Sequence, residues 1–398
     1  MSDDGEGSGP LVYLIAGEPS GDLLGARLMA ALQEKGSGPF RFAGVGGERM
    51  TAAGLRSLFP MAELSVMGLV EVLPRAPRLL SRIRETVRDI RRRRPDVVVT
   101  VDAPGFCFRV ATRLKGAGIP LVHYVAPTVW AWRPRRAAKV ARLFDRLLTL
   151  LPFEPPYFER EGLACTFVGH PAVEEATQGQ GDAFRTQQGI PADVPLLAVL
   201  PGSRVGEVSR MLPVFADAVG LLANRIPDLH VLIATVPSVA ERVNAETASW
   251  STPVTIIGAS ETKADAFAAA DAAIAASGTV TLELGAARTP MVVAYRMAPL
   301  TMFIAKRLVR VPYVTLMNLV LGQGAIPELI QEACTAENVA GEAEKLLVDQ
   351  AARAAQIGAI EQALAALGGS SDEQTPSQRA ARVVADIARR AATPNSNP

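Results

Sequence analysis

The chain has 398 residues, enough for two or three domains, and 49% of them are hydrophobic whereas 20% are charged. This composition excludes a disordered protein and predicts large buried cores. The 41 lysine and arginine residues nearly balance 40 acidic residues, so no overall charge attracts nucleic acid, and we expect no nucleic-acid partner. The three cysteines are too few and too scattered to predict a disulfide framework or a zinc site.

Membrane spans and targeting segments are not predicted. Mean hydropathy is slightly positive, yet no apolar run reaches the ~18 residues that a spanning helix needs. Residues 1–10 are acidic and rich in glycine and serine, without the basic and apolar regions of a signal peptide. We therefore expect a disordered tail at 1–10 and a cytoplasmic protein.

Short apolar runs alternate with helical stretches along the first half of the chain. The predicted strands are residues 11–16, 42–45, 96–101, 121–125 and 147–151, and predicted helices include 23–34 and 79–93. Continuous apolar strands that alternate with helices indicate a buried parallel sheet. Residues 11–177 are therefore predicted to form a Rossmann-like domain.

A polar stretch at residues 178–182 predicts a linker, after which a second series of the same kind begins. Its predicted strands are residues 196–200, 231–234, 254–257, 272–275 and 291–294, in a second Rossmann-like domain over 183–345. Residues 346–392 are predicted to be C-terminal helices, from segments near 337–367 and 376–391. The fold class is α/β, and two such domains favour a ligand cleft at the carboxyl ends of their strands.

The loop after the first predicted strand, residues 16–22, is a candidate site. Gly21 permits close backbone approach, and a helix N-terminus behind Glu18, Ser20 and Asp22 favours an anion or a polar ligand. The alternative is an ordinary turn in which Ser20 or Asp22 caps the helix. Asp102 follows the third predicted strand, where a general base would face the cleft; the alternative is a turn or cap aspartate.

The loop after the fourth predicted strand concentrates Trp130, Trp132 and Arg133, a combination typical of a binding wall. The alternative is that one tryptophan anchors the following helix in the core. His123 lies inside the predicted strand, where a lone histidine is more often a core residue than a base.

Two loops of the second half predict anion and sugar contacts. Gly202, Ser203 and Arg204 lie at a helix N-terminus, where amides and a guanidinium suit a diphosphate. The second loop, at residues 277–279, repeats this pattern. Glu283, one turn into the helix that follows, could accept hydrogen bonds from two ribose hydroxyls. The alternative is that Glu283 belongs to a capping box at the start of that helix. The candidate residues of this segment are Ser277, Gly278, Thr279 and Glu283.

Two apolar segments lie beside arginines and predict contact with an anionic bilayer. The first, residues 61–80, contains Val66, Met67, Leu69 and Val70 and precedes an arginine-rich stretch. The second, residues 297–311, contains Met302 and Phe303. The alternative for each is a buried helix with a solvated arginine face.

In combination, these segments resemble the lipid-A-disaccharide synthase family. The segments that carry the resemblance are residues 17–22, 102–104, 129–133, 169–171, 200–204, 277–283, 318 and 327–332. The resemblance runs in order from about residue 11 to residue 340. Pro19 and Met317 depart from the residues expected there, without removing a polar functional group.

The resemblance implies a GT-B fold and an inverting glycosyl transfer. The donor would be UDP-2,3-diacylglucosamine and the acceptor 2,3-diacylglucosamine 1-phosphate (lipid X), giving a β(1→6) disaccharide 1-phosphate and UDP. It also implies a metal-independent, cofactor-free enzyme, peripheral on the inner face of the inner membrane. Its C-terminal helices would either pack back on the same chain or be exchanged in a homodimer.

The candidate roles follow from the expected chemistry. Asp102 is the first candidate for the base, with Glu18 and Asp22 as competitors, Arg204 would meet the diphosphate, and Glu283 the ribose. Residues expected near the donor are Asn318, Glu328 and Gln331. The alternatives are an epimerase or peptidoglycan-type glycosyltransferase of the same fold, or a non-catalytic UDP-sugar-binding membrane scaffold.

Overall fold

The computed structural model describes residues 9–34, 39–64, 69–132, 135–174, 179–258, 263–298, 302, 311–369 and 374–393, without the side chains of 69–76 and 132. The chain divides into two compact units. Unit 1 comprises Met1–Pro171 and Ser371–Pro398, and unit 2 comprises Ala172–Ser370.

Unit 1 is built on a parallel six-stranded sheet in the order β2-β1-β3-β4-β5-β6. The strands are β1 Leu11–Ala16, β2 Arg41–Val45, β3 Val97–Val101, β4 Leu121–Tyr124, β5 Arg146–Thr149 and β6 Ala164–Phe167. The connecting helices are α1 Pro19–Gln33, α2 Glu48–Ala52, α3 Leu69–Arg93, α4 Pro104–Leu114, α5 Val129–Trp132, α6 Arg136–Ala141 and α7 Pro155–Glu159. Strands β1 and β3 are buried throughout, which explains their uninterrupted apolar sequences.

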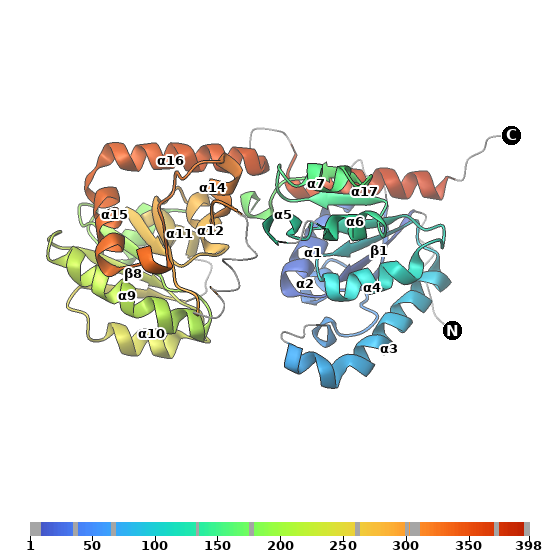
Figure 1. Cartoon of the computed structure of the whole chain (residues 1–398), viewed down its shortest axis with the longest axis horizontal. Coiled ribbons are helices and arrows are strands. Elements are labelled where there is room, and N and C mark those ends of the chain that lie inside the picture. The colour runs from blue at the N-terminus through green and yellow to red at the C-terminus, as the bar shows by residue number, and fades with distance from the viewer. Residues whose placement is uncertain are drawn as a thin grey trace. The chain divides into compact units, whose positions relative to one another are not determined.

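The last helix of the chain, α17 (Pro376–Ala392), packs in unit 1 against α1 (Figure 1). A capping box between Thr375 and Gln378 starts the helix, and its small apolar face at Ala380 and Val384 is buried with Leu28. Residues 346–392 were expected as one group of helices. The structure instead separates them, because α17 belongs to unit 1 and the helices before it belong to unit 2.

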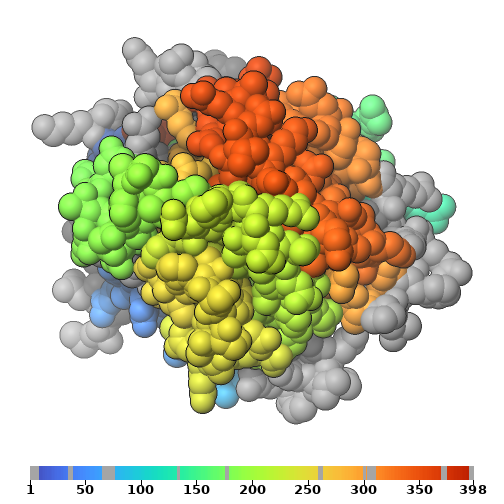
Figure 2. Space-filling model, turned by 90° about the vertical axis from the view of Figure 1, so that its left-hand side faces the viewer, coloured from blue at the N-terminus to red at the C-terminus, as the bar shows by residue number. Residues whose placement is uncertain are grey.

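Unit 2 contains a second parallel six-stranded sheet, in the order β12-β11-β10-β7-β8-β9. The strands are β7 Leu196–Leu200, β8 His230–Ala234, β9 Val254–Ile257, β10 Ala272–Ala275, β11 Met291–Tyr295 and β12 Glu328–Ile330. The helices are α8 Gly181–Gln188, α9 Val205–Ala223, α10 Ala240–Thr247, α11 Lys263–Ala269, α12 Val280–Ala286, α14 Leu316–Leu321, α15 Ala336–Val348 and α16 Gln350–Leu364. Figure 2 views the molecule onto this unit, with the orange-red α15 against the yellow-green α9.

Two boundaries of unit 2 differ from the sequence expectation. The predicted linker 178–182 enters a helix, because α8 begins at Gly181 and the backbone N–H of Gln180 donates to Asp265 at 2.6 Å. The predicted helical segment 337–367 is interrupted at Asp349, whose carboxylate accepts hydrogen bonds from the amides of Ala351 and Ala352 and starts α16.

None of the described helices combines the length and the apolar character that a membrane-spanning helix requires.

Candidate functional site

The carboxyl edge of the sheet in unit 1 carries unusual backbone strain. Asp102 and Ala103, directly after β3, have φ of 48° and 43°, and Val125, directly after β4, has φ of 81°. Left-handed backbone costs a residue with a Cβ atom about 1–2 kcal/mol, and such strain clusters at functional sites. The strain therefore marks the ends of β3 and β4 as a candidate site.

Glu18 and Asp102 form an acidic pair at this edge. The loop after β1 lies against the loop after β3 so closely that a Cβ on Gly17 would approach the Ala103 Cβ to 2.8 Å. Burial raises the pKa of the half-buried Asp102 carboxyl. Partial burial and then the negative charge of Asp102 raise the pKa of Glu18. A carboxylate with a raised pKa is a stronger base, so the pair is suited to accepting a proton.

Asp22 has a different environment from the other two acids. Its side chain is only 4% exposed, and its oxygens accept hydrogen bonds from the backbone N–H groups of Gly47 (2.7 Å), Arg49 (3.0 Å) and Met50 (3.1 Å). The carboxylate thus fixes the start of α2 to α1, and three backbone amides already use its oxygens. The geometry gives Asp22 a structural role and leaves Asp102 and Glu18 as the candidate bases.

Of the other residues predicted near this edge of the sheet, the structure describes Ser20, Gly21 and His123 but not Arg133. Ser20 is exposed at the start of α1, and Gly21 lies so close to β3 that a Cβ there would be 3.3 Å from the Val101 carbonyl oxygen. His123 is a core residue as predicted: it is buried, its Nδ1 lies 2.7 Å from the Thr100 hydroxyl, and its ring stacks on Phe144.

A buried carboxyl that the sequence analysis missed holds Trp130. The indole N–H of Trp130 donates to Glu154 Oε1 at 3.2 Å, while Oε2 of Glu154 accepts from the amides of Leu150 and Leu151. Burial raises the pKa of Glu154 to about 7, although these three hydrogen bonds oppose the shift. Glu154 follows β5 only five residues after Thr149, so its position after a strand was the available signal.

We expect the fluorescence of Trp130 to titrate near pH 7. Raising the pH from 5 to 9 ionises Glu154 and turns a neutral hydrogen bond to the indole into a charge-assisted one. Emission of the whole chain should therefore change with a midpoint near 7, and the change should disappear in Trp130→Phe and Glu154→Gln. A transition that persists in Trp130→Phe would assign it to another tryptophan and contradict the prediction.

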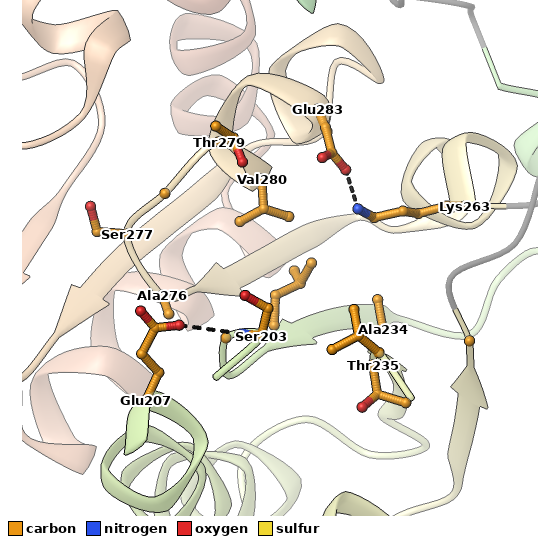
Figure 3. A pocket seen from close by; sticks show the side chains of 15 residues that line it. Ser203, Glu207, Ala234, Thr235, Lys263, Ala276, Ser277, Thr279, Val280 and Glu283 are labelled. Atoms are coloured by element: carbon orange, nitrogen blue, oxygen red, sulfur yellow. Dashed lines mark hydrogen bonds and ion pairs between the residues drawn. The ribbon is translucent and has the colours of Figure 1, made fainter. Parts of the chain in front are cut away.

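Unit 2 contains a cavity of about 250 Å³ at the carboxyl ends of β7 and β10 (Figure 3). It is lined by predicted residues of two loops and by residues after β8 and β9. The lining residues are Leu200, Gly202, Ser203, Glu207, Ala234, Thr235, Val236, Gly258, Lys263, Ala276, Ser277, Gly278, Thr279, Val280 and Glu283. The structure therefore brings together the two loops that the sequence analysis selected in this half.

The backbone amide of Ser203, predicted to bind a diphosphate, donates a hydrogen bond to the Glu207 carboxylate instead. Glu207 Oε2 accepts a long hydrogen bond of 3.4 Å from the backbone N–H of Ser203 (Figure 3), and Oε1 accepts one of 2.9 Å from Arg204. The Arg204 side chain is 76% exposed and does not line the cavity. Glu207 also accepts from the Tyr295 hydroxyl at 3.2 Å. Glu207 was not predicted as a site residue, although its position three residues after Arg204 is a common ion-pair spacing.

Glu283 faces Lys263 across the cavity, and the two side chains form an ion pair (Figure 3). Glu283 is the fourth residue of α12, as predicted, but Thr279 makes no side-chain cap at the start of that helix. Both charged side chains are about one-third exposed, so they can exchange partners with a ligand. The buried Thr235 hydroxyl has no hydrogen-bond partner among the described residues and supplies a further free polar group.

The three residues predicted near the donor do not line this cavity. Asn318 is fully buried, with its amide group bonded to Ile326 and to Glu328. Glu328 accepts from the amides of Val314 and Thr315, from the Thr315 hydroxyl and from Asn318. Both side chains therefore tie α14 to β12. Gln331 differs, because its buried Nε2 has no partner among the described residues and its φ is 56°.

Replacing Glu328 with alanine should destabilise unit 2. Four donors would lose their acceptor at once, and we expect the free energy of unfolding to fall by about 2–4 kcal/mol. Urea denaturation measures this, with Glu337→Ala on the exposed side of α15 as a control expected to stay within about 0.5 kcal/mol. Unchanged stability combined with weaker ligand binding would instead make Glu328 a ligand contact.

The predicted membrane residues are only partly described. Val66, Met67 and Phe303 lie outside the described residues, as do the side chains of Leu69 and Val70, and Met302 is half-buried. In α3, Arg82 pairs with Glu63 and Glu85, while Arg92 and Arg93 pair with Asp89. The remaining exposed groups on this helix include Leu80, which is 42% exposed, and the arginines Arg84 and Arg88. The arginine-rich stretch is therefore partly neutralised within the fold.

Comparisons with known proteins agree with this architecture. The model of the lipid-A-disaccharide synthetase family matches residues 12–383. The lipid-A-disaccharide synthase of Rhodospirillum centenum is 52% identical over 381 residues, covering 95% of this chain and 94% of the relative.

Solved structures of low sequence identity show the same fold. The glycotransferase of kitacinnamycin superposes with a TM-score of 0.65 at 16% identity, covering 96% of this chain and 100% of that chain. The UDP-GlcNAc 2-epimerase of Neisseria meningitidis, solved bound to UDP-GlcNAc, gives 0.58 at 11% identity, covering 94% and 98%. The two units thus form the GT-B architecture. Because the family model and a relative at 52% identity each cover nearly the whole chain, the chain belongs to the lipid-A-disaccharide synthase family, glycosyltransferases of lipid A biosynthesis.

Proposed function

We propose that this enzyme transfers 2,3-diacylglucosamine from UDP to the 6-hydroxyl of 2,3-diacylglucosamine 1-phosphate (lipid X). The bond from the sugar C1 to the UDP oxygen breaks, the new bond forms between C1 and the acceptor oxygen, and the acceptor proton leaves to a base. Inversion at C1 in one displacement gives the β(1→6) disaccharide 1-phosphate and UDP. The observation that carries the proposal is the cavity of unit 2, which combines loop amides, a free hydroxyl and the Glu283 carboxylate.

Unit 2 is proposed to hold the UDP part of the donor. Amides at the start of the 19-residue α9 and the Arg204 guanidinium would neutralise the diphosphate, after Glu207 releases the Ser203 N–H. Glu283 would accept hydrogen bonds from ribose hydroxyls in exchange for Lys263. The side-chain Nε2 of Gln331 has no partner among the described residues, and a ligand would satisfy it, which supports a role at the donor as well.

Unit 1 is proposed to hold the acceptor, with Asp102 as the base. The strained backbone at Asp102 and Ala103 fixes the carboxylate at the strand end, and burial has already raised its pKa. Glu18 beside it is the alternative base. Trp130, held by Glu154, would form an apolar wall beside the acceptor.

We propose that the transfer needs neither a metal ion nor a cofactor, because amides and arginine supply positive charge at the diphosphate. Activity should then survive dialysis against EDTA.

We also propose that the enzyme works on the inner face of the inner membrane, using the apolar segments near α3 and residue 302. A homodimer with exchanged C-terminal segments is proposed too, since an α17 from a second chain could bury Ala380 and Val384 against the same face of α1.

The decisive experiment incubates the full chain with UDP-2,3-diacylglucosamine and lipid X and analyses the products by mass spectrometry. The expected result is the tetraacyl disaccharide 1-phosphate with stoichiometric UDP. Epimerised UDP-sugar, or UDP binding without turnover of any acylated acceptor, would overturn the proposal in favour of an epimerase or a UDP-sugar-binding scaffold.

A further inference from the structure

A second concave site lies on unit 1, between the first turns of α4 and helix α6. Its volume is about 310 Å³, and its lining includes Gly105, Phe108, Arg109, Arg136 and Lys139. Ligand pockets usually measure about 300–1,000 Å³, so this site suits a small group better than a complete diacylated sugar. The mechanism proposed above does not use it.

The charges that line this pocket are all positive. Arg109, Arg136 and Lys139 contribute three cations, and no acid contributes to the lining. In the described part of the chain, no carboxylate lies within ion-pair distance of any of the three. The arginines of α3 are different, because Arg82 and Arg93 are neutralised by acids of their own unit. Three close cations without counter-charge predict an anionic ligand.

A hydrogen bond within α4 also fixes the position of one of these cations, Arg109. The Arg109 guanidinium donates to the carbonyl of Gly105, one turn earlier in α4, and is thereby held over the first turn of this eleven-residue helix. The positive end of the helix dipole adds to the charge at the same place. Phe108, which is buried, supports the floor of the pocket.

The position of the pocket connects it to the proposed base. Pro104 belongs to the lining and follows Asp102 by two residues, so their Cα atoms are at most roughly 7 Å apart. A sugar whose hydroxyl contacts Asp102 could therefore place another substituent in the basic pocket.

We propose that this pocket binds the phosphate monoester of the lipid acceptor, an inference that rests on the proposed function. A monoester carries a charge of about −1.5 to −2 at pH 7, more than a phosphodiester headgroup, and three cations match it better. Arginine can also bind phosphate oxygens in pairs. The pocket would thus recognise the 1-phosphate and orient the 6-hydroxyl toward Asp102.

The test compares acceptors with and without the phosphate in the double variant Arg109→Gln/Arg136→Gln. We expect kcat/KM for lipid X to fall by about 10- to 100-fold, while kcat/KM for the dephosphorylated acceptor and KM for the donor change less than about threefold. Arg113→Gln, an exposed arginine of α4 outside the pocket, controls for the loss of a positive charge on the same helix and should behave as wild type. Equal losses on both acceptors, or no loss, would overturn the assignment.

Two further measurements are needed. One tests phosphate binding in the pocket independently of the proposed enzymatic function, and the other distinguishes the acceptor phosphate from the phosphate of membrane lipids. Binding of glucosamine 1-phosphate to the full chain, by calorimetry, should weaken in the double variant even if no acceptor is turned over, so it tests the pocket when the proposed function fails. Vesicles containing phosphatidylglycerol should bind the wild type and the double variant alike. Loss of vesicle binding with an unchanged preference between acceptors would assign the pocket to membrane headgroups and overturn the substrate assignment.

Discussion

Asp102→Asn is expected to lower kcat by roughly 10²- to 10⁴-fold, the usual contribution of a positioned general base, while affinity for UDP stays within about twofold. Asparagine is the appropriate substitution because Asp102 has a left-handed backbone, which asparagine tolerates better than most residues with a Cβ. The change therefore removes the charge and the basicity while keeping the shape of the strand end.

The measurement is steady-state kinetics with UDP-2,3-diacylglucosamine and lipid X, together with UDP binding by calorimetry. Asp22→Asn is the matched comparison, since Asp22 supports α2 through three backbone amides and its replacement should lower stability. Turnover of Asp102→Asn near the wild-type rate would remove Asp102 as the base and direct attention to Glu18.

The acidic pair also predicts a pH dependence. The base works when deprotonated, so kcat/KM should fall as the pH is lowered, with an inflection above the ordinary aspartate pKa of about 3.9, because burial raises the pKa of Asp102. In Glu18→Gln the inflection should stay in place, because burial raises the pKa of Asp102, whereas the charge of Asp102 contributes to the raised pKa of Glu18. Glu48→Gln, an exposed acid of α2, is the control and should leave the profile unchanged. Loss of the inflection in Glu18→Gln would instead make Glu18 the titrating base.

Most of the strands that the sequence identifies are buried over most of their length; β9 is an exception, since only Ile257 of its four residues is buried. The ranges 11–16, 196–200, 254–257 and 272–275 agree with β1, β7, β9 and β10. The two missed strands, β6 and β12, are edge strands of three or four residues with mostly half-buried side chains, so their sequences show no uninterrupted apolar run. Glu328, which the family resemblance places near the donor, begins β12 and accepts the hydrogen bonds that anchor α14.

The cavity loops of unit 2 were predictable because glycine and hydroxyl residues follow strands, where parallel sheets place ligands. The roles of the acids were less predictable. Asp22, Asp102 and Glu18 are all acidic residues near strand ends in the sequence. Only tertiary contacts show that Asp22 accepts hydrogen bonds from three backbone amides, whereas Asp102 lies at a strained strand end. Glu154 and Glu207 were missed for the same reason, since their partners Trp130 and Tyr295 are far apart from them in sequence.

Glu283→Ala is expected to weaken UDP binding by at least about 10²-fold. The proposed contact has one carboxylate accepting hydrogen bonds from two ribose hydroxyls, and each charge-assisted bond contributes about 1.5–3 kcal/mol. In the unliganded protein this carboxylate pairs with Lys263, at a site where both side chains are about one-third exposed. An ion pair of that exposure is worth about 0–1 kcal/mol, so giving it up costs little. Lys263→Met should accordingly change UDP affinity by no more than about fivefold.

A ligand lacking the ribose hydroxyls separates this role from a general loss of shape in the cavity. Wild type should bind 2′,3′-dideoxy-UDP about 10²-fold more weakly than UDP, whereas Glu283→Ala should bind the two ligands with nearly equal affinity, because the partner of the hydroxyls is gone. Glu283→Gln keeps one carbonyl acceptor and should fall between the two, with a loss of about tenfold. If Glu283→Ala still prefers UDP over its dideoxy analogue as strongly as wild type does, the ribose contact is made elsewhere. The next side chain to replace is then Thr235 in the same cavity, whose hydroxyl has no partner within the described ranges.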